Sequence, residues 1–139
     1  MTSAVQTLPD SMTLHQAAAF LASPDAHHPS FPVVDAEEHV LGIVDPPTVL
    51  RWRRVGRHRR TTLRELLASS RATVAHPDEY LDGLIGRMTR ANVAYIPIVD
   101  GEGERLVGYI GWKDLMNVRS RLQAEERERV VLYRVRWQR

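Results

Sequence analysis

The chain has 139 residues, which is enough for one ordinary domain or for two half-domains that share a core. It contains no cysteine, which excludes disulfides, thiolate metal sites and a cysteine nucleophile, and a cytoplasmic location fits this composition. The first residues lack a signal sequence and no apolar run approaches the ~20 residues that span a bilayer, so we expect a soluble chain. The formal net charge is +2, and of the 19 basic residues all but Lys113 are arginine.

The first half predicts a helix, a hairpin of two strands, a second helix and a third, short helix, over residues 10–23, 31–34, 40–44, 47–55 and 62–68. Apolar residues at i, i+3, i+4 and i+7 mark the first helix, with Asp10 or Ser11 as its cap. Gly56 ends the second helix, and Thr61 or Thr62 caps the third.

The second half predicts a short extended segment, a helix, a strand-turn-strand unit and a long helix, over residues 73–75, 81–92, 95–110 and 112–129. Asn92 ends the first of these helices, and the turn between the strands is acidic and rich in glycine. Glutamate and arginine at i, i+4 support the charged end of the long helix. Residues 133–137 alternate apolar and polar side chains, which is typical of a strand.

The two halves repeat one pattern about sixty-five residues apart. Phe-Pro-Val-Val-Asp at residues 31–35 matches Ile-Pro-Ile-Val-Asp at residues 96–100, and a second strand with an internal glycine follows each. Because neither unit can bury its sheet alone, we expect an α+β fold of two repeats packed about a pseudo-twofold axis. We place the first repeat with its basic linker at residues 1–60, and the second with its charged helix and tail at residues 61–139.

This duplicated pattern, completed by Asp114 and Leu115 on a helix, resembles a tandem pair of cystathionine β-synthase (CBS) domains, also called a Bateman module. The resemblance covers nearly the whole chain. It implies a non-catalytic regulatory module without a required cofactor. Its regulatory ligand would be AMP, ADP, ATP or S-adenosylmethionine.

The resemblance also implies one usable ligand site, in the second repeat. In such domains an aspartate on the last helix accepts the ribose hydroxyls, while a hydroxyl residue and the helix N-terminal amides favour phosphate. Asp114 stands at the ribose position with Lys113 beside it, but Gly111 replaces the hydroxyl residue. The expected ligand-binding residues are Val74, Ala75, Tyr95, Pro97, Trp112, Lys113 and Asp114.

The first repeat departs further from the family pattern. Thr48 takes the aspartate position and Asp45 the hydroxyl position, where a carboxylate would repel phosphate. Simpler roles also exist in the second repeat. Asp114 equally fits a helix N-terminal acid favoured by the helix dipole, and core packing suits Tyr95 and Trp112 better than base stacking.

Other chemistry has little support in the sequence. The histidines show no metal-ligand spacing, and the pair His27 and His28 comes nearest to one. The turn acids of residues 100–104 read as solvated side chains, and there is neither a nucleophile elbow nor a glycine-rich phosphate loop. We therefore expect no catalytic and no metal-binding residues.

The basic run of residues 51–60 invites rival functions. We favour a solvated linker or a docking face for a partner domain, then an anionic membrane surface, and last nucleic acid. Nucleic acid ranks last because the run has no helix-turn-helix context and Trp52 is its lone aromatic residue.

The stretch from Gly108 to Arg129 is similar to the cytosolic carboxy-terminal end of bacterial chloride-channel (ClC) transport proteins that carry CBS pairs. This similarity implies a homodimeric module at the inner face of the cell membrane that regulates an attached anion channel or transporter. The alternatives are a free-standing sensor or dimerisation adaptor for an unrelated enzyme, and an arginine-rich nucleic-acid-binding protein.

Overall fold

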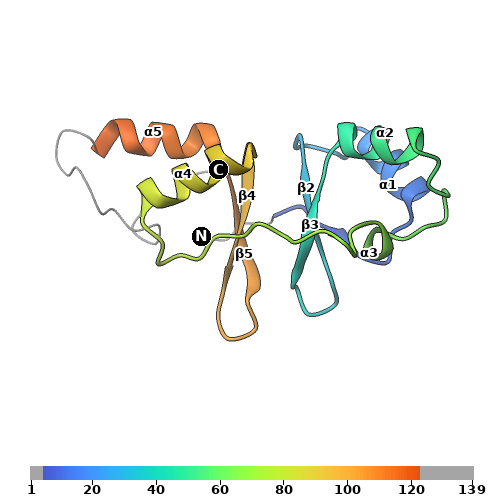
Figure 1. Ribbon diagram of the computed structural model, residues 1–139, viewed down its shortest axis with the longest axis horizontal. Coiled ribbons are helices and arrows are strands. Elements are labelled where there is room, and N and C mark those ends of the chain that lie inside the picture. The colour runs from blue at the N-terminus through green and yellow to red at the C-terminus, as the bar shows by residue number, and fades with distance from the viewer. Residues whose placement is uncertain (1–4, 123–139) are drawn as a thin grey trace. The chain divides into compact units, whose positions relative to one another are not determined.

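The computed structural model describes residues 5–122, which form two compact units (Figure 1). One unit is Gln6–Ala72, and the other holds residues 73–122 together with Val5. The first unit includes helix α3 (Leu63–Leu66) and so extends beyond residue 60, where the sequence analysis places the repeat boundary. The charged segment after residue 122 and the alternating residues 133–137 lie outside the described residues.

The first unit contains, in chain order, β1 (Leu8–Pro9), α1 (Leu14–Leu21), β2 (Phe31–Val34), β3 (Val40–Val44), α2 (Pro46–Arg54) and α3. Strand β2 lies in the middle of the sheet, parallel to β1 and antiparallel to β3. Both strands of the predicted hairpin are confirmed. All four residues of β2 are buried.

The predicted cap of α1 is wrong, because Thr13 and not Asp10 or Ser11 begins this helix. The Thr13 hydroxyl accepts the Gln16 amide at 3.1 Å, and the Gln16 side-chain oxygen accepts the Thr13 amide at 2.9 Å. This reciprocal capping box satisfies amides that the helix itself leaves unpaired. Asp10 instead binds the guanidinium of Arg64, 54 positions along the chain, at 2.7 Å.

The second unit contains α4 (Leu81–Ala91), β4 (Tyr95–Asp100), β5 (Arg105–Gly111) and α5 (Trp112–Leu122). Asn92 ends α4 in the left-handed conformation, with φ of 56°, as predicted. The apolar face of α4 packs on the sheet and on α5, burying Leu84, Met88 and Leu115 completely. Each such side chain contributes about 1.5–3 kcal/mol by leaving water.

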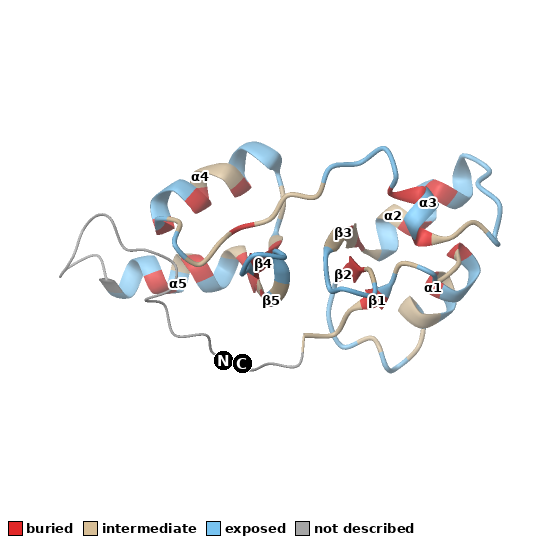
Figure 2. Ribbon diagram, turned by 90° about the horizontal axis from the view of Figure 1, so that it is seen from below, coloured by how far each residue is buried: buried red, intermediate tan, exposed pale blue. Residues whose placement is uncertain are grey.

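The duplication is visible in the strand register. In the first unit Leu8 on β1 pairs in parallel with Val33, and in the second Ala75 pairs in parallel with Ile98, which is the matching position of the repeat. Both hairpins also shift register immediately after this residue. The shared bulge shows that the two sequence copies adopt the same strand geometry. In Figure 2 buried residues fall on helices and strands of both units.

Candidate functional site

Val74, Ala75 and Pro97, predicted to line a ligand site, lie together at one edge of β4. The Ala75 amide donates to the Pro97 carbonyl at 2.9 Å, and the Ala75 carbonyl accepts the Val99 amide at 2.9 Å. Ala75 is buried and belongs to the core, whereas Val74 is half-buried. The backbone of this segment is therefore hydrogen-bonded along β4.

A hydrogen-bonded network that the sequence analysis missed holds this segment to α4. Arg87 donates to the Val74 carbonyl at 2.6 Å and to Glu79 at 2.5 Å. The other oxygen of Glu79 accepts the His76 amide at 2.9 Å, and the His76 ring lies 3.2 Å from Glu104 in the β4–β5 turn. Because Arg87 lies 8 positions from Glu79 and 13 from Val74, no local pattern could have identified its role.

Tyr95, another predicted site residue, covers Gly111. The two residues are paired across the hairpin, and a Cβ atom added to Gly111 would lie 2.9 Å from Cε2 of Tyr95. The Tyr95 ring also stacks on Tyr109 at 5.3 Å between centroids and 26° between planes. Position 111 therefore lacks the hydroxyl residue of the family pattern, and the Tyr95 ring occupies the space that a side chain at this position would need.

Trp112, Lys113 and Asp114 form the first turn of α5. The Trp112 amide donates to the Ala94 carbonyl at 2.8 Å, and its half-buried ring packs against the core. Lys113 and Asp114 are exposed, and no hydrogen bond or ion pair to another described residue holds either side chain. Of the predicted site residues, these two are exposed, whereas Val74, Tyr95 and Trp112 are half-buried.

The equivalent helix of the first unit begins differently. Asp45 caps α2, and its carboxylate accepts the Thr48 amide at 2.9 Å. Gly111 stands at the same place before α5 and has no side chain that could cap it. The N-terminus of α2 is thus capped by a carboxylate, whereas α5 has no side-chain cap at position 111 and carries Asp114 within its first turn.

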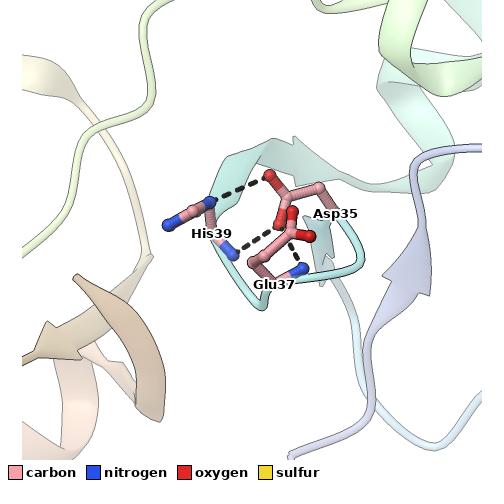
Figure 3. Close-up of side chains that lie close together, drawn as sticks. All are labelled: Asp35, Glu37 and His39. Atoms are coloured by element: carbon pink, nitrogen blue, oxygen red, sulfur yellow. Dashed lines mark hydrogen bonds and ion pairs between the residues drawn. The ribbon is translucent and has the colours of Figure 1, made fainter. Parts of the chain in front are cut away.

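A third cluster lies in the turn between β2 and β3 (Figure 3). Asp35 accepts hydrogen bonds from the amides of Glu37 and His39, both at 2.9 Å, and its second oxygen lies 3.0 Å from Nδ1 of His39. Burial raises the pKa of the Asp35 carboxyl, but the hydrogen bonds from His39 and Glu37 outweigh it and hold the pKa below the ordinary 3.8. The carboxylate form therefore stabilises this turn.

The same three side chains place metal-ligand atoms within 4.8 Å of one another. Carboxylate and imidazole donors suit divalent transition metals. Their contacts, however, are those that close the hairpin turn, so we assign the cluster to the turn. The pair His27 and His28 came nearest to metal-ligand spacing in the sequence. In the described chain the histidines that meet carboxylates are His39, beside Asp35, and His76, beside Glu79 and Glu104.

Comparisons with known proteins agree with this duplicated geometry. The CBS domain family model matches residues 1–54 and 63–121. A comparison with curated proteins finds no match. Within the described residues, no helix is both long and apolar enough to cross a membrane.

Several solved structures share the fold. Hypoxic Response Protein I with two coordinated zinc ions has a TM-score of 0.72 at 18% identity, over 85% of this chain and 94% of that one. The CBS domain pair of protein MJ0100, in complex with 5′-methylthioadenosine and S-adenosyl-L-methionine, has a TM-score of 0.65 at 21% identity, over 85% and 90%. The cytosolic domain of the Mg²⁺ channel MgtE in complex with ATP has a TM-score of 0.65 at 22% identity, over 82% and 44%.

The fold thus defines a mixed α+β protein built from a duplicated unit of helices and a short sheet. The family match covers both units, and the chain belongs to the CBS domain family as a tandem pair.

Proposed function

We propose that this CBS pair is a non-catalytic regulatory module that binds an adenine nucleotide or S-adenosylmethionine through its second domain. The contrast between the two helix N-termini carries the proposal. Asp45 places a carboxylate on the amides of α2, which would repel phosphate, whereas α5 begins after Gly111 and exposes Lys113 and Asp114. An exposed carboxylate can accept both ribose hydroxyls, and an uncapped helix N-terminus with a lysine favours phosphate.

The segment around Val74 would supply the second part of the site. The Val74 carbonyl accepts Arg87, and the amide and carbonyl of Ala75 are paired with β4, so this backbone is fixed in place. The half-buried Val74 side chain would offer an apolar contact to a base. Two proteins of the same fold support the ligand class, since MJ0100 is described with two adenosyl ligands and the cytosolic domain of MgtE with ATP. In this proposal Arg87 positions the segment and does not touch the ligand.

Titration of the chain with AMP, ADP, ATP and S-adenosylmethionine, followed by calorimetry and thermal unfolding, tests the proposal. A ligand at about 100 times its dissociation constant should stabilise the chain by about 2.7 kcal/mol. Asp114→Ala should remove most of this effect. The matched control is Asp78→Ala, an exposed aspartate of the same unit, which should retain it. Unchanged stability with all four ligands would contradict the proposal and leave a structural pair.

We further propose that the pair acts as a homodimer and controls an attached transport domain. The cytosolic domain of MgtE, which belongs to a Mg²⁺ channel, supports a transporter in general. Assignment to a chloride channel rests on the similarity of residues 108–129 to ClC proteins. A free-standing adaptor for an unrelated enzyme is the second candidate. Analytical ultracentrifugation tests the dimer, and fractionation of the native protein into membrane or supernatant separates the two candidates.

A further inference from the structure

The basic run of α2 and its following loop is an ordered surface, although its composition reads as a linker. Helix α2 is anchored by Val49 and Trp52, which are 5% and 8% exposed. The opposite side of the helix carries Leu50, Arg51 and Arg54, all exposed, because these residues lie away from the buried pair on the helical wheel.

The end of α2 is closed by a defined motif. The Gly56 amide donates to the Arg53 carbonyl at 3.1 Å, and the Arg57 amide donates to the Trp52 carbonyl at 3.0 Å. Gly56 supplies the positive φ of 84° that this Schellman arrangement requires. Arg57 is thereby fixed directly beyond the helix.

The remaining loop is tied to the start of α1. The Arg59 carbonyl accepts the His15 amide at 2.9 Å, and the Thr61 carbonyl accepts the Leu14 amide at 2.8 Å. His58 accepts the Arg60 amide on its ring nitrogen at 3.0 Å. These contacts hold the main chain while the side chains of Arg59 and Arg60 stay exposed.

The exposed members of this segment are here called the arginine surface, and they are Leu50, Arg51, Arg53, Arg54, Val55, Arg57, Arg59 and Arg60. In the part of the chain that the structure covers, none of its guanidinium groups makes an ion pair. Glu65 is the acid whose pKa an arginine of this surface lowers. The hydrogen bonds from Thr62, with which Glu65 forms a capping box, lower this pKa most, and the positive charge of Arg57 lowers it further. The positive charge is therefore not neutralised by described residues.

Two exposed aliphatic side chains indicate the kind of partner that the arginine surface would bind. Leu50 is 51% exposed and Val55 is 67% exposed, and each is next in sequence to one exposed arginine, Arg51 and Arg54. Duplex or single-stranded nucleic acid would use the charge but not the aliphatic groups, and Trp52 is too buried to stack on a base. A lipid interface uses both, because apolar side chains enter the headgroup region while basic ones meet anionic headgroups.

We propose that the arginine surface binds a bilayer surface that carries anionic phospholipids. This inference goes beyond ligand sensing and does not depend on it, since no residue of the arginine surface belongs to the proposed nucleotide site. The contact is peripheral: basic side chains supply most of the attraction, and Leu50 and Val55 add insertion at the headgroup level.

Vesicle binding of the full chain tests the proposal. The probe is a phosphatidylcholine vesicle with about 30% phosphatidylglycerol, compared with pure phosphatidylcholine, read by co-sedimentation. We expect binding to the anionic vesicles alone, weakened when salt rises from about 0.1 M to about 0.5 M. Each arginine removed should weaken binding roughly fivefold, so the triple variant of Arg54, Arg57 and Arg60 to glutamine should lose roughly 100-fold.

Two controls separate this surface from net charge and from nucleic acid. The triple variant of Arg71, Arg90 and Arg105 to glutamine removes the same charge from exposed positions elsewhere and should bind vesicles like the unmodified chain. The double variant of Leu50 and Val55 to serine should weaken vesicle binding several-fold.

Circular dichroism establishes that each variant folds. Equal losses in the two arginine variants would overturn the proposal. So would tighter binding to duplex DNA than to vesicles at the same salt, with no effect of the serine variant, because nucleic acid would then be the partner.

Discussion

Replacing Gly111 by alanine should destabilise the second unit, although alanine is usually the better residue for folding. The φ of Gly111 lies outside the left-handed region, so the backbone accepts a side chain. The new Cβ, however, would lie 2.9 Å from Cε2 and 3.3 Å from Cδ2 of Tyr95. Such an approach is closer than van der Waals contact, and the Tyr95 ring must therefore move.

The size of the effect follows from what moves. Overfilling a packed site costs about 1–3 kcal/mol, and this includes the stack of Tyr95 on Tyr109, worth about 0.5–1.5 kcal/mol. The reduced freedom of the unfolded chain returns about 0.4–1 kcal/mol. The net expectation for Gly111→Ala is a loss of about 1–2 kcal/mol, or a drop in Tm of about 3–8 °C.

Gly83→Ala is the matched control, because it makes the same chemical change in α4 where an added Cβ meets nothing within 4 Å. It should stabilise the chain by roughly 0.5–1 kcal/mol through helix propensity. Urea and thermal unfolding of both variants measure the difference. If Gly111→Ala were as stable as Gly83→Ala, the close packing of Tyr95 on Gly111 would be refuted.

The remaining predictions concern contacts that fix loops. Arg87→Met should lower the free energy of unfolding by about 1–2 kcal/mol and speed amide exchange at Ala75, because two charge-assisted hydrogen bonds are lost from a side chain that is 35% exposed; the exposed Arg90→Met should change neither. A lowered pKa means that the Asp35 carboxylate stabilises the folded chain above pH 3.8 and loses this effect as the pH falls through the lowered pKa. Asp35→Asn should therefore be less stable than the unmodified chain near pH 7, and the difference should shrink as the pH falls below 3.8. The measurement is the free energy of unfolding in urea as a function of pH, for Asp35→Asn and for the unmodified chain. A difference between the two chains that does not change with pH would contradict this prediction.

The sequence indicated which residues belong to the proposed site, but it did not establish what each of them does. The family resemblance grouped Val74, Ala75 and Pro97 in one predicted site, and the structure pairs Ala75 with Pro97 through a backbone hydrogen bond. Core packing was the favoured role of Trp112 from the sequence, and the structure shows its ring packed against the core. The roles of Lys113 and Asp114 stay predictions, because their exposure alone does not establish a ligand.

The sequence by itself determined the strands of both hairpins, the helix periodicity and the duplication, since these depend on side-chain patterns within a few residues. It also determined Asn92 as a helix end, because a left-handed cap is a local preference. It did not indicate the pairing of β1, whose two residues join β2 only in the folded unit. Only the tertiary structure decided that Arg87 holds Val74, that Tyr95 covers Gly111, and that the basic run is fixed against the start of α1. These contacts join residues that are distant in the chain. They depend on packing and hydrogen-bond geometry in the folded protein, which a local sequence pattern cannot predict.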